Sequence, residues 1–165
     1  MKKLFYVWIF VVLLGAFYSC DSRADDTALW LARSCIGEAG WNSWNTGECS
    51  AILHIYKKRS EITGQSILKQ ASQYSSAIKD FKGKRNRWVL NLKENAEKPK
   101  HWPSNLNWKK YKFHWIMTMI FVEMFLRNMT VDPIPNAVHY GCTLDTPPKG
   151  AKKIRTNYRN IFYRW

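Results

Sequence analysis

The chain has 165 residues, and 46% of them are hydrophobic, so it can form one domain with a sizeable core, and its composition excludes a disordered chain. Its 26 lysines and arginines outnumber its 12 acids, and the resulting net charge of +14 favours polyanionic partners such as nucleic acid, anionic lipid or an acidic wall polymer. The nine tryptophans and eight tyrosines offer flat rings to nucleobases and sugars alike, so composition alone does not choose between these partners.

The first 24 residues are typical of a secretory signal. A lysine pair precedes an apolar run, Leu4–Tyr18, whose length of about 15 residues is short for a membrane span of roughly 20. Small residues before Asp25 predict cleavage there, which leaves residues 25–165 as a single mature domain. Lipid attachment at Cys20 and an uncleaved membrane anchor are the alternatives. Export to the cell envelope argues against a nucleic-acid partner.

Residues 25–40 are expected to form a helix. An acid pair suits its start, where the helix dipole favours negative charge, and Gly40 suits its end. On a helical projection the apolar side chains share an arc of about 160°, and Glu38 falls at the border of this arc, about 20° from Leu31. A side chain at this border is half desolvated and still within reach of a ligand.

Residues 40–47 are expected to form a loop that carries Trp41, because Gly, Asn and Ser are frequent there. A second helix is predicted over residues 48–60, capped by Asn45 or Thr46. Its apolar stripe consists of Cys49, Ile52, Leu53 and Tyr56. Its solvent-facing side consists of Ser50, His54, Lys57 and Lys58.

The rest of the chain is expected to alternate between helical and irregular segments. Residues 63–79 predict a short helix and a turn, and residues 82–112, rich in Lys, Arg and Trp, predict a basic, aromatic-rich insertion with an exposed surface. The apolar residues 114–128 contain Glu123, which favours a buried helix over a membrane span. Two prolines then block helix, so residues 131–143 are expected to be loop and short extended structure.

Cleavage before Asp25 would leave three cysteines, Cys35, Cys49 and Cys142. In an oxidising compartment one pair can be bridged, and the sequence leaves the pairing open. A Cys/His hydrolase that uses one of them with His139 or His54 is an alternative, although a buried cysteine acts more often as a small hydrophobe. No C-x-x-C or H-x-x-x-H spacing occurs, so we expect no metal and no cofactor.

Glu38 is the candidate catalytic residue. Apolar surroundings disfavour the charged form of its carboxyl, and an acid that stays protonated near neutrality can donate its proton to a glycosidic oxygen. Glycoside cleavage usually uses a second carboxylate. Glu48 is the nearest in sequence, although an acid in the first turn of a helix is also favoured by the dipole alone. Asp132 and Asp145, on either side of the "HYG" segment, are further candidates.

Three ordered motifs resemble those of a known family. They are Gly37-Glu38-Ala39 followed by Gly47-Glu48, then Gln70 with Gln73-Tyr74-Ser75, and finally Ala137 with His139-Tyr140. Together they are similar to the cell-wall hydrolase family that includes the spore cortex-lytic enzymes, and the first motif also looks like that of phage-type muralytic proteins. The chain departs from the family pattern at Glu48, where the family has Gln, and over residues 82–112, which have no counterpart.

The resemblance implies a compact α+β, mainly α, lysozyme-like domain that cleaves peptidoglycan glycan strands as a lytic transglycosylase or a muramidase. It places the catalytic role on Glu38, and the residues expected to line the glycan groove are Trp41, Gln73, Tyr74, His139 and Tyr140. In the transglycosylase route one Glu suffices, because it protonates the bridging oxygen and then accepts the proton of the sugar's own 6-hydroxyl. The alternative is a non-catalytic, cationic wall-binding protein on the same fold, which anionic envelope polymers would attract.

Overall fold

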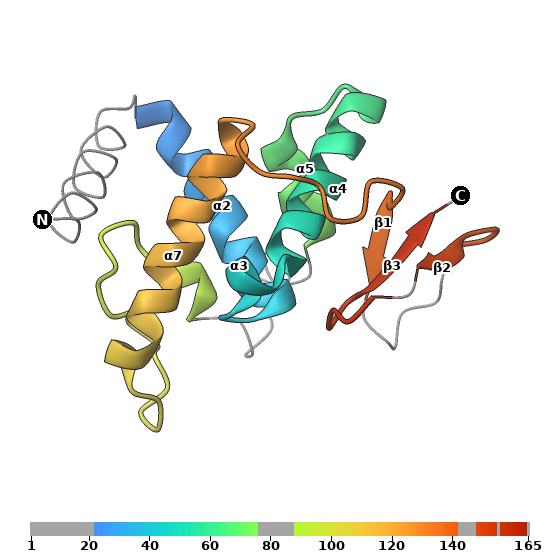
Figure 1. The fold of residues 1–165 in the computed structure, drawn as a ribbon. Helices are drawn as coiled ribbons and strands as arrows, with labels where there is room; N and C mark the ends of the chain where they lie inside the picture. Colours follow the sequence, from blue (N-terminus) through green and yellow to red (C-terminus); the bar gives the residue numbers. More distant parts are fainter. Residues whose placement is uncertain (1–21, 76–87, 142–147, 155, 165) are drawn as a thin grey trace, which may run out of the picture.

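A computed structural model describes residues 22–75, 88–141, 148–154 and 156–164, and for residues 22–26 and Tyr74 it describes the backbone alone. The helices come first and a small sheet last, so the α+β, mainly α, class is confirmed. In chain order the elements are α2 (Ser22–Ala39), α3 (Ser43–Thr46), α4 (Glu48–Thr63), α5 (Ile67–Tyr74), the 3-10 turn η1 (Val89–Asn91), α7 (Trp108–Leu126), β1 (His139–Gly141), β2 (Lys152–Ile154) and β3 (Ile161–Arg164) (Figure 1).

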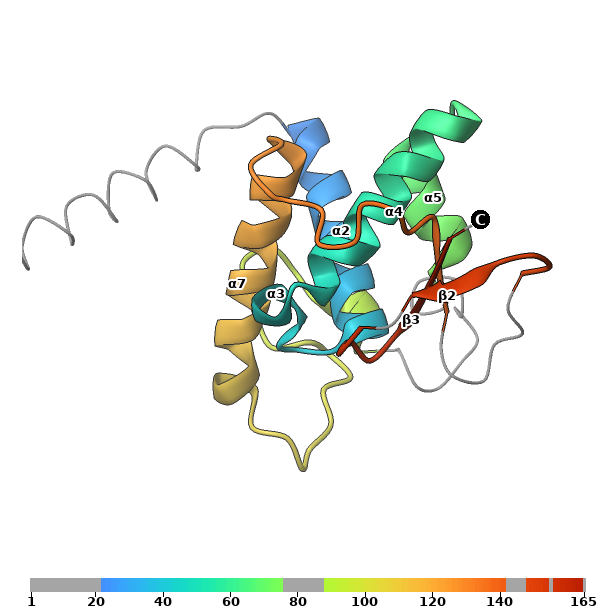
Figure 2. The same cartoon turned by 45° about the vertical axis from the view of Figure 1, so that its right-hand side comes forward.

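Helix α2 is the centre of the domain, with α7 on one side and α4 and α5 on the other (Figures 1 and 2). Five of the seven residues of its predicted apolar arc are buried, with Leu31 fully shielded from solvent, and Leu29 and Ala39 are partly buried. The helix begins at Ser22, so the predicted cleavage before Asp25 falls in its first turn. It ends where predicted, because Gly40 takes the left-handed conformation (φ 88°) and donates its N–H to the Ile36 carbonyl at 3.0 Å.

The link between α2 and α4 is more ordered than the sequence predicted. Residues 43–46 form α3, so Asn45 and Thr46 lie inside a helix, and the prediction that one of them caps α4 is wrong. Gly47 precedes α4 instead, with a φ of 80°. The predicted apolar stripe of α4 is fully buried.

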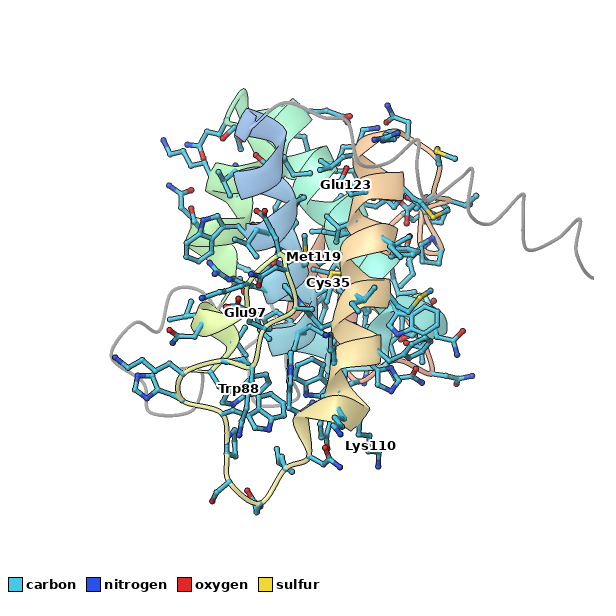
Figure 3. All side chains as sticks on the ribbon, turned by 90° about the vertical axis from the view of Figure 1, so that its left-hand side faces the viewer. Cys35, Trp88, Glu97, Lys110, Met119 and Glu123 are labelled. Carbon is cyan, nitrogen blue, oxygen red and sulfur yellow. A yellow bond between two sulfur atoms is a disulfide. The ribbon has the colours of Figure 1, made fainter. Side chains whose placement is uncertain are left out.

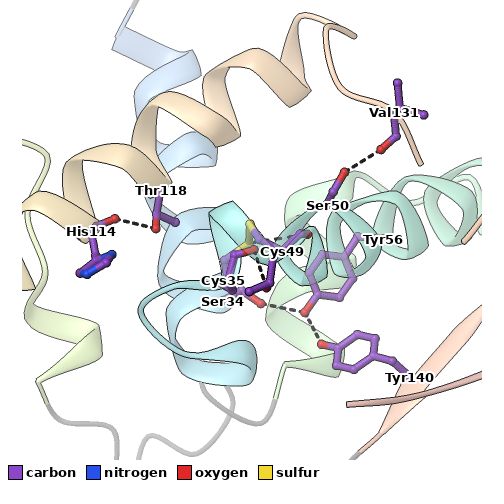
Figure 4. The surroundings of a disulfide bond; sticks show 11 residues. Ser34, Cys35, Cys49, Ser50, Tyr56, His114, Thr118, Val131 and Tyr140 are labelled. Carbon is purple, nitrogen blue, oxygen red and sulfur yellow. Dashed lines mark hydrogen bonds between the residues drawn. A yellow bond between two sulfur atoms is a disulfide. The ribbon is translucent and has the colours of Figure 1, made fainter. Parts of the chain in front are cut away.

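A disulfide joins Cys35 of α2 to Cys49 of α4, and the two cysteines are 14 positions apart in the sequence (Figure 4). It fixes the last turns of α2 against the first turn of α4. The pairing that the sequence left open is therefore Cys35 with Cys49, and Cys142 lies outside the described residues.

Helix α7 starts six residues before its predicted boundary, at Trp108, where the Asn107 side chain accepts a hydrogen bond from the Lys109 N–H at 3.0 Å. It runs antiparallel to α2 (Figure 1). The prediction of a buried helix holds for one face only, because its buried side chains are Trp115, Thr118, Val122 and Phe125. None of the helices in the described ranges is long and apolar enough to cross a membrane.

The predicted insertion contributes to the core, and the expectation that its rings decorate an exposed surface is wrong for the described residues 88–112. Val89 and Leu92 are fully buried, and Trp102 is only 7% exposed. The Trp115 indole N–H donates to the Lys93 carbonyl at 2.8 Å and ties the segment to α7. Its lysines remain exposed, so charge faces water while the rings face inward.

The C-terminal part forms an antiparallel sheet of order β1-β3-β2, which pairs Tyr140 with Phe162 and Ile154 with Phe162. Only the extended structure of β1 was predicted. The face of α4 that was expected to be exposed to solvent contacts the loop before β1. Ser50 donates a hydrogen bond to the Val131 carbonyl, His54 bonds to Thr130, and Lys57 donates to Asn128. Lys58 forms an ion pair with Asp132 and donates to the carbonyls of Ile134, Pro135 and Ala137.

Candidate active site

Glu38 occupies the last turn of α2, and its side chain is partly exposed. Ser75, the residue that ends α5, is fully buried and donates its hydroxyl to Glu38 Oε1 at 2.7 Å. Asn160, just before β3, donates its side-chain amide to the Glu38 carbonyl at 3.1 Å. Two distant parts of the chain therefore fix this acid, Ser75 through its carboxyl and Asn160 through its backbone carbonyl.

Behind Glu38 lies a chain of buried hydroxyl groups. Tyr56 Oη is 2.7 Å from Ser34 Oγ and 2.5 Å from Tyr140 Oη (Figure 4). The Ser75 hydroxyl, which donates to the Glu38 carboxyl, also lowers the pKa of Tyr56, so it adjoins both this network and the acid. The network crosses from α2 to α4 to β1, and it gives the acid a rigid polar wall.

The two tyrosines of this wall stay neutral. Burial, together with the negative charge of Glu38, raises the pKa of Tyr56 to about 12. Burial also raises the pKa of Tyr140 well above its ordinary value, with Tyr56 and Glu38 adding to the effect. The wall can therefore exchange hydrogen bonds with Glu38 and with a bound hydroxyl group without adding a charge.

Glu48, the possible second acid, is only 4% exposed. Its Oε1 accepts two hydrogen bonds from Asn160, one from the backbone N–H at 2.6 Å and one from the side-chain amide at 2.9 Å. The carboxylate thus anchors the C-terminal strand to the start of α4. This geometry favours a structural role for Glu48 over a catalytic one.

The backbone conformation and close packing at position 47 explain why a glycine precedes Glu48. A Cβ at Gly47 would lie 2.9 Å from the Tyr158 hydroxyl, and the φ of 80° is in the left-handed region. The Gly47-Glu48 pair therefore joins α4 to the C-terminal segment by close approach and by hydrogen bonds.

Trp41 lies in a cluster of rings between the end of α2 and the start of α7. Its indole stacks on Trp88, with 5.3 Å between ring centroids, and meets the rings of Trp102, Trp108 and Tyr111 at distances between 5.1 and 6.3 Å. Figure 3 shows Trp88 at the side of this cluster. These contacts explain the position of Trp41 by packing, and its role in substrate binding stays a prediction.

Helix α5 carries two of the predicted groove residues, Gln73 and Tyr74. Gln73 is exposed, and the side chain of Tyr74 lies outside the described part of the structure. Gln70 is buried and donates to Thr63 Oγ1 at 2.9 Å and to Gln65 Oε1 at 3.0 Å, so it fixes the turn between α4 and α5. The residue that α5 delivers to the acid is Ser75.

His139 of β1 is partly exposed, and its Nδ1 is hydrogen-bonded to a guanidinium N–H of Arg59. A guanidinium can only donate, so Nδ1 accepts and the ring proton is on Nε2. Arg59 also donates Nε–H to the Val138 carbonyl at 3.2 Å. Of the two predicted residues of the "HY" motif, Tyr140 joins the hydroxyl network behind Glu38, whereas His139 is oriented by α4.

The Cys/His alternative loses two of its three nucleophiles, because Cys35 and Cys49 are bonded to each other. Asp132 forms an ion pair with Lys58 at 2.7 Å, and Asp145 lies outside the described residues. Within the described ranges, no group of three or more His, Cys, Asp and Glu side chains could hold a metal ion.

Sequence reasoning did not single out several residues of the site. A tyrosine on the apolar stripe of α4 signals a buried hydroxyl that needs a partner, and this points to Tyr56. Ser75 ends the Gln73-Tyr74-Ser75 motif, so the sequence pointed to its position but did not predict its hydrogen bond to Glu38. Asn160 has no comparable signal. Comparisons with protein-family models, curated proteins and solved structures found no match.

Proposed function

We propose that the protein cleaves the glycan strands of peptidoglycan on a lysozyme-like fold, with Glu38 as general acid and then general base. The observation that carries the proposal is the placement of Glu38: a partly exposed carboxyl at a helix end, held by Ser75 and backed by neutral tyrosine hydroxyls. Such an acid can reach a polymer from one side while its own position is fixed from the other.

The environment of Glu48 favours the single-acid route. Its carboxylate is buried and accepts two hydrogen bonds from Asn160, so it is poorly placed to activate water. In the proposed reaction Glu38 gives its proton to the bridging oxygen and the glycosidic bond breaks. The Glu38 carboxylate then takes the proton of the sugar's 6-hydroxyl, whose oxygen bonds to the anomeric carbon. The acid is regenerated and the product is an anhydro sugar.

The Cys35–Cys49 disulfide supports export, because such bonds persist in oxidising compartments. The positive charge supports an anionic polymer as the partner. The exposed side chains of Lys109, Lys110 and Lys112 favour a second candidate, a cationic wall-binding protein without activity.

Purified peptidoglycan incubated with the wild-type protein, Glu38→Gln and Glu48→Gln separates these functions. We expect anhydro muropeptides from the wild type and from Glu48→Gln, and none from Glu38→Gln. Reducing ends in place of anhydro ends would assign the muramidase route. Equal release by the wild type and Glu38→Gln would reject Glu38 as the acid. Wall binding without any release by the wild type would favour the second candidate.

A further inference from the structure

Helix α7 has a second apolar face that the described part of the protein covers only in part. Its buried stripe, which includes Trp115 and Val122, turns toward α2. At about 100° per residue the opposite face carries Phe113, Ile116, Met117, Ile120 and Met124. Phe113 is 57% exposed and Ile116 is 39% exposed. A contiguous apolar stripe of this kind on a soluble domain marks an interaction surface.

Basic side chains lie at both ends of the stripe. Lys109 and Arg127 fall on the same outward face, Lys110 and Lys112 lie beside it, and all four are exposed. Figure 3 looks at this side of the molecule, with Lys110 at the N-terminal end of α7 and Glu123 near the other end. The surface therefore combines apolar and cationic chemistry, and Glu123 is the only acid of α7.

A tryptophan adjoins the stripe. Trp44 of α3 meets the Phe113 ring edge-on, with 6.2 Å between centroids, and donates its indole N–H to His114 Nδ1 at 3.3 Å. An indole with an apolar body and a polar edge suits the boundary between hydrocarbon and water.

The stripe continues past the end of α7. Met129 is 57% exposed and Val131 is 84% exposed. Figures 1 and 2 place the segment after α7 beside the start of α2. The apolar run Leu4–Tyr18 joins the chain at this same end, because its last residue is four positions before Ser22. In the uncleaved-anchor alternative, a membrane that receives this run would lie next to Met129 and Val131.

We propose that the outward face of α7 lies on an anionic membrane surface, with its apolar stripe at the level of the lipid headgroups and its lysines against their phosphates. Apolar contact with flanking Lys and Arg is the chemistry by which helices bind anionic lipid in the plane of the interface. A second copy of the chain is a poorer occupant, because two proteins of charge +14 would bring their lysines together. The proposal does not rest on the proposed catalytic function.

The full chain tests this directly, with Ile116 replaced by a dansyl-bearing amino acid so that the native cysteines need no label. The matched control carries the same group in place of Ile62, which is 74% exposed at the end of α4. On vesicles of phosphatidylcholine and phosphatidylglycerol we expect a blue shift at position 116 and none at position 62. In the double variant Lys109→Gln/Lys110→Gln, the lipid concentration that gives half of the maximal shift should rise roughly 25-fold.

Several outcomes would overturn the proposal. One is an unshifted probe at position 116, whether or not the protein sediments with the vesicles. Another is a shift of the same size on phosphatidylcholine alone, because this would remove the role of charge. A blue-shifted probe in the absence of vesicles would also contradict it. Such a shift would indicate a second copy if it depended on protein concentration, and coverage by residues 4–18 if it did not.

Discussion

Asn160 donates two hydrogen bonds to one oxygen of Glu48, so a residue of the C-terminal segment satisfies an acid that is buried at the start of α4. We expect Glu48→Gln to keep this arrangement, because the amide oxygen still accepts both bonds. Its unfolding midpoint and product release should stay near the wild type. Asn160→Ala removes the side-chain donor and should cost about 2–3 kcal/mol in urea unfolding. An inactive but folded Glu48→Gln would restore Glu48 as a second catalytic acid.

Ser75 positions Glu38 through a single hydroxyl. If Glu38 is the catalytic acid, Ser75→Ala should lower kcat by about 10-fold and leave KM nearly unchanged, since it removes one hydrogen bond to the Glu38 carboxyl. Ser72→Ala is the matched control, because Ser72 is exposed on the same helix and bonds only the Lys69 carbonyl. Rates of muropeptide release measure both variants. Equal loss in the two would trace the effect to α5 as a whole.

The disulfide between Cys35 and Cys49 closes a loop of 14 residues. Removing it with Cys35→Ala and Cys49→Ala should lower the free energy of unfolding by about 3 kcal/mol, chiefly because the unfolded chain gains freedom. Urea unfolding with and without a reductant measures the effect. The double variant should be insensitive to the reductant, whereas the wild type should lose stability to the same level. An insensitive wild type would contradict the bridge.

Lys58 and Lys57 are neighbours on α4 with different environments. Lys58 binds the carboxylate of Asp132 at 2.7 Å and three backbone carbonyls of the loop before β1, whereas Lys57 makes one exposed contact with Asn128. We expect Lys58→Met to cost about 2–3 kcal/mol and Lys57→Met less than about 0.5 kcal/mol. Thermal unfolding compares them. Equal effects would mean that charge alone matters at this face.

His54 makes stability depend on pH. Burial lowers its pKa from 6.5, with Lys57 and Lys58 acting in the same direction and Asp132 opposing them. The folded protein therefore prefers the neutral ring, and this stability is present above the unfolded pKa and lost as the pH falls through the folded one. Between pH ~7.5 and ~5, His54→Gln should lose less stability than the wild type. Urea unfolding of both proteins across this pH range measures the difference.

Periodicity in the sequence predicted the helical framework well. Most of the arc that contains Leu31 and the whole stripe that contains Tyr56 are buried as expected, because both repeat with the period of a helix. The same analysis placed Glu38 at the border of an apolar face, and its side chain is partly exposed. Gly40 ends α2 for the local reason that only glycine takes its φ without strain.

Contacts between distant parts of the chain could not be predicted in this way. Asn160 and Glu48 are 112 positions apart, and neither has a local pattern that points to the other. The rings of Trp88 and Trp102 were expected at the surface because lysines surround them in the sequence. In the fold the rings turn inward to meet Trp41, and the lysines turn outward. Local composition does not show which side of a segment faces the core.

A newly made chain carries thiols at positions 35 and 49. Until they are oxidised, the helix end that bears Glu38 and the helix start that receives the C-terminal strand are joined covalently only through residues 40–47. If the protein is exported and cuts peptidoglycan, its catalytic geometry would be fixed by this bond only after it leaves the reducing cytoplasm. The disulfide would then determine when the protein becomes active as well as the shape of the site. The reduced protein inside the cell would lack this bond.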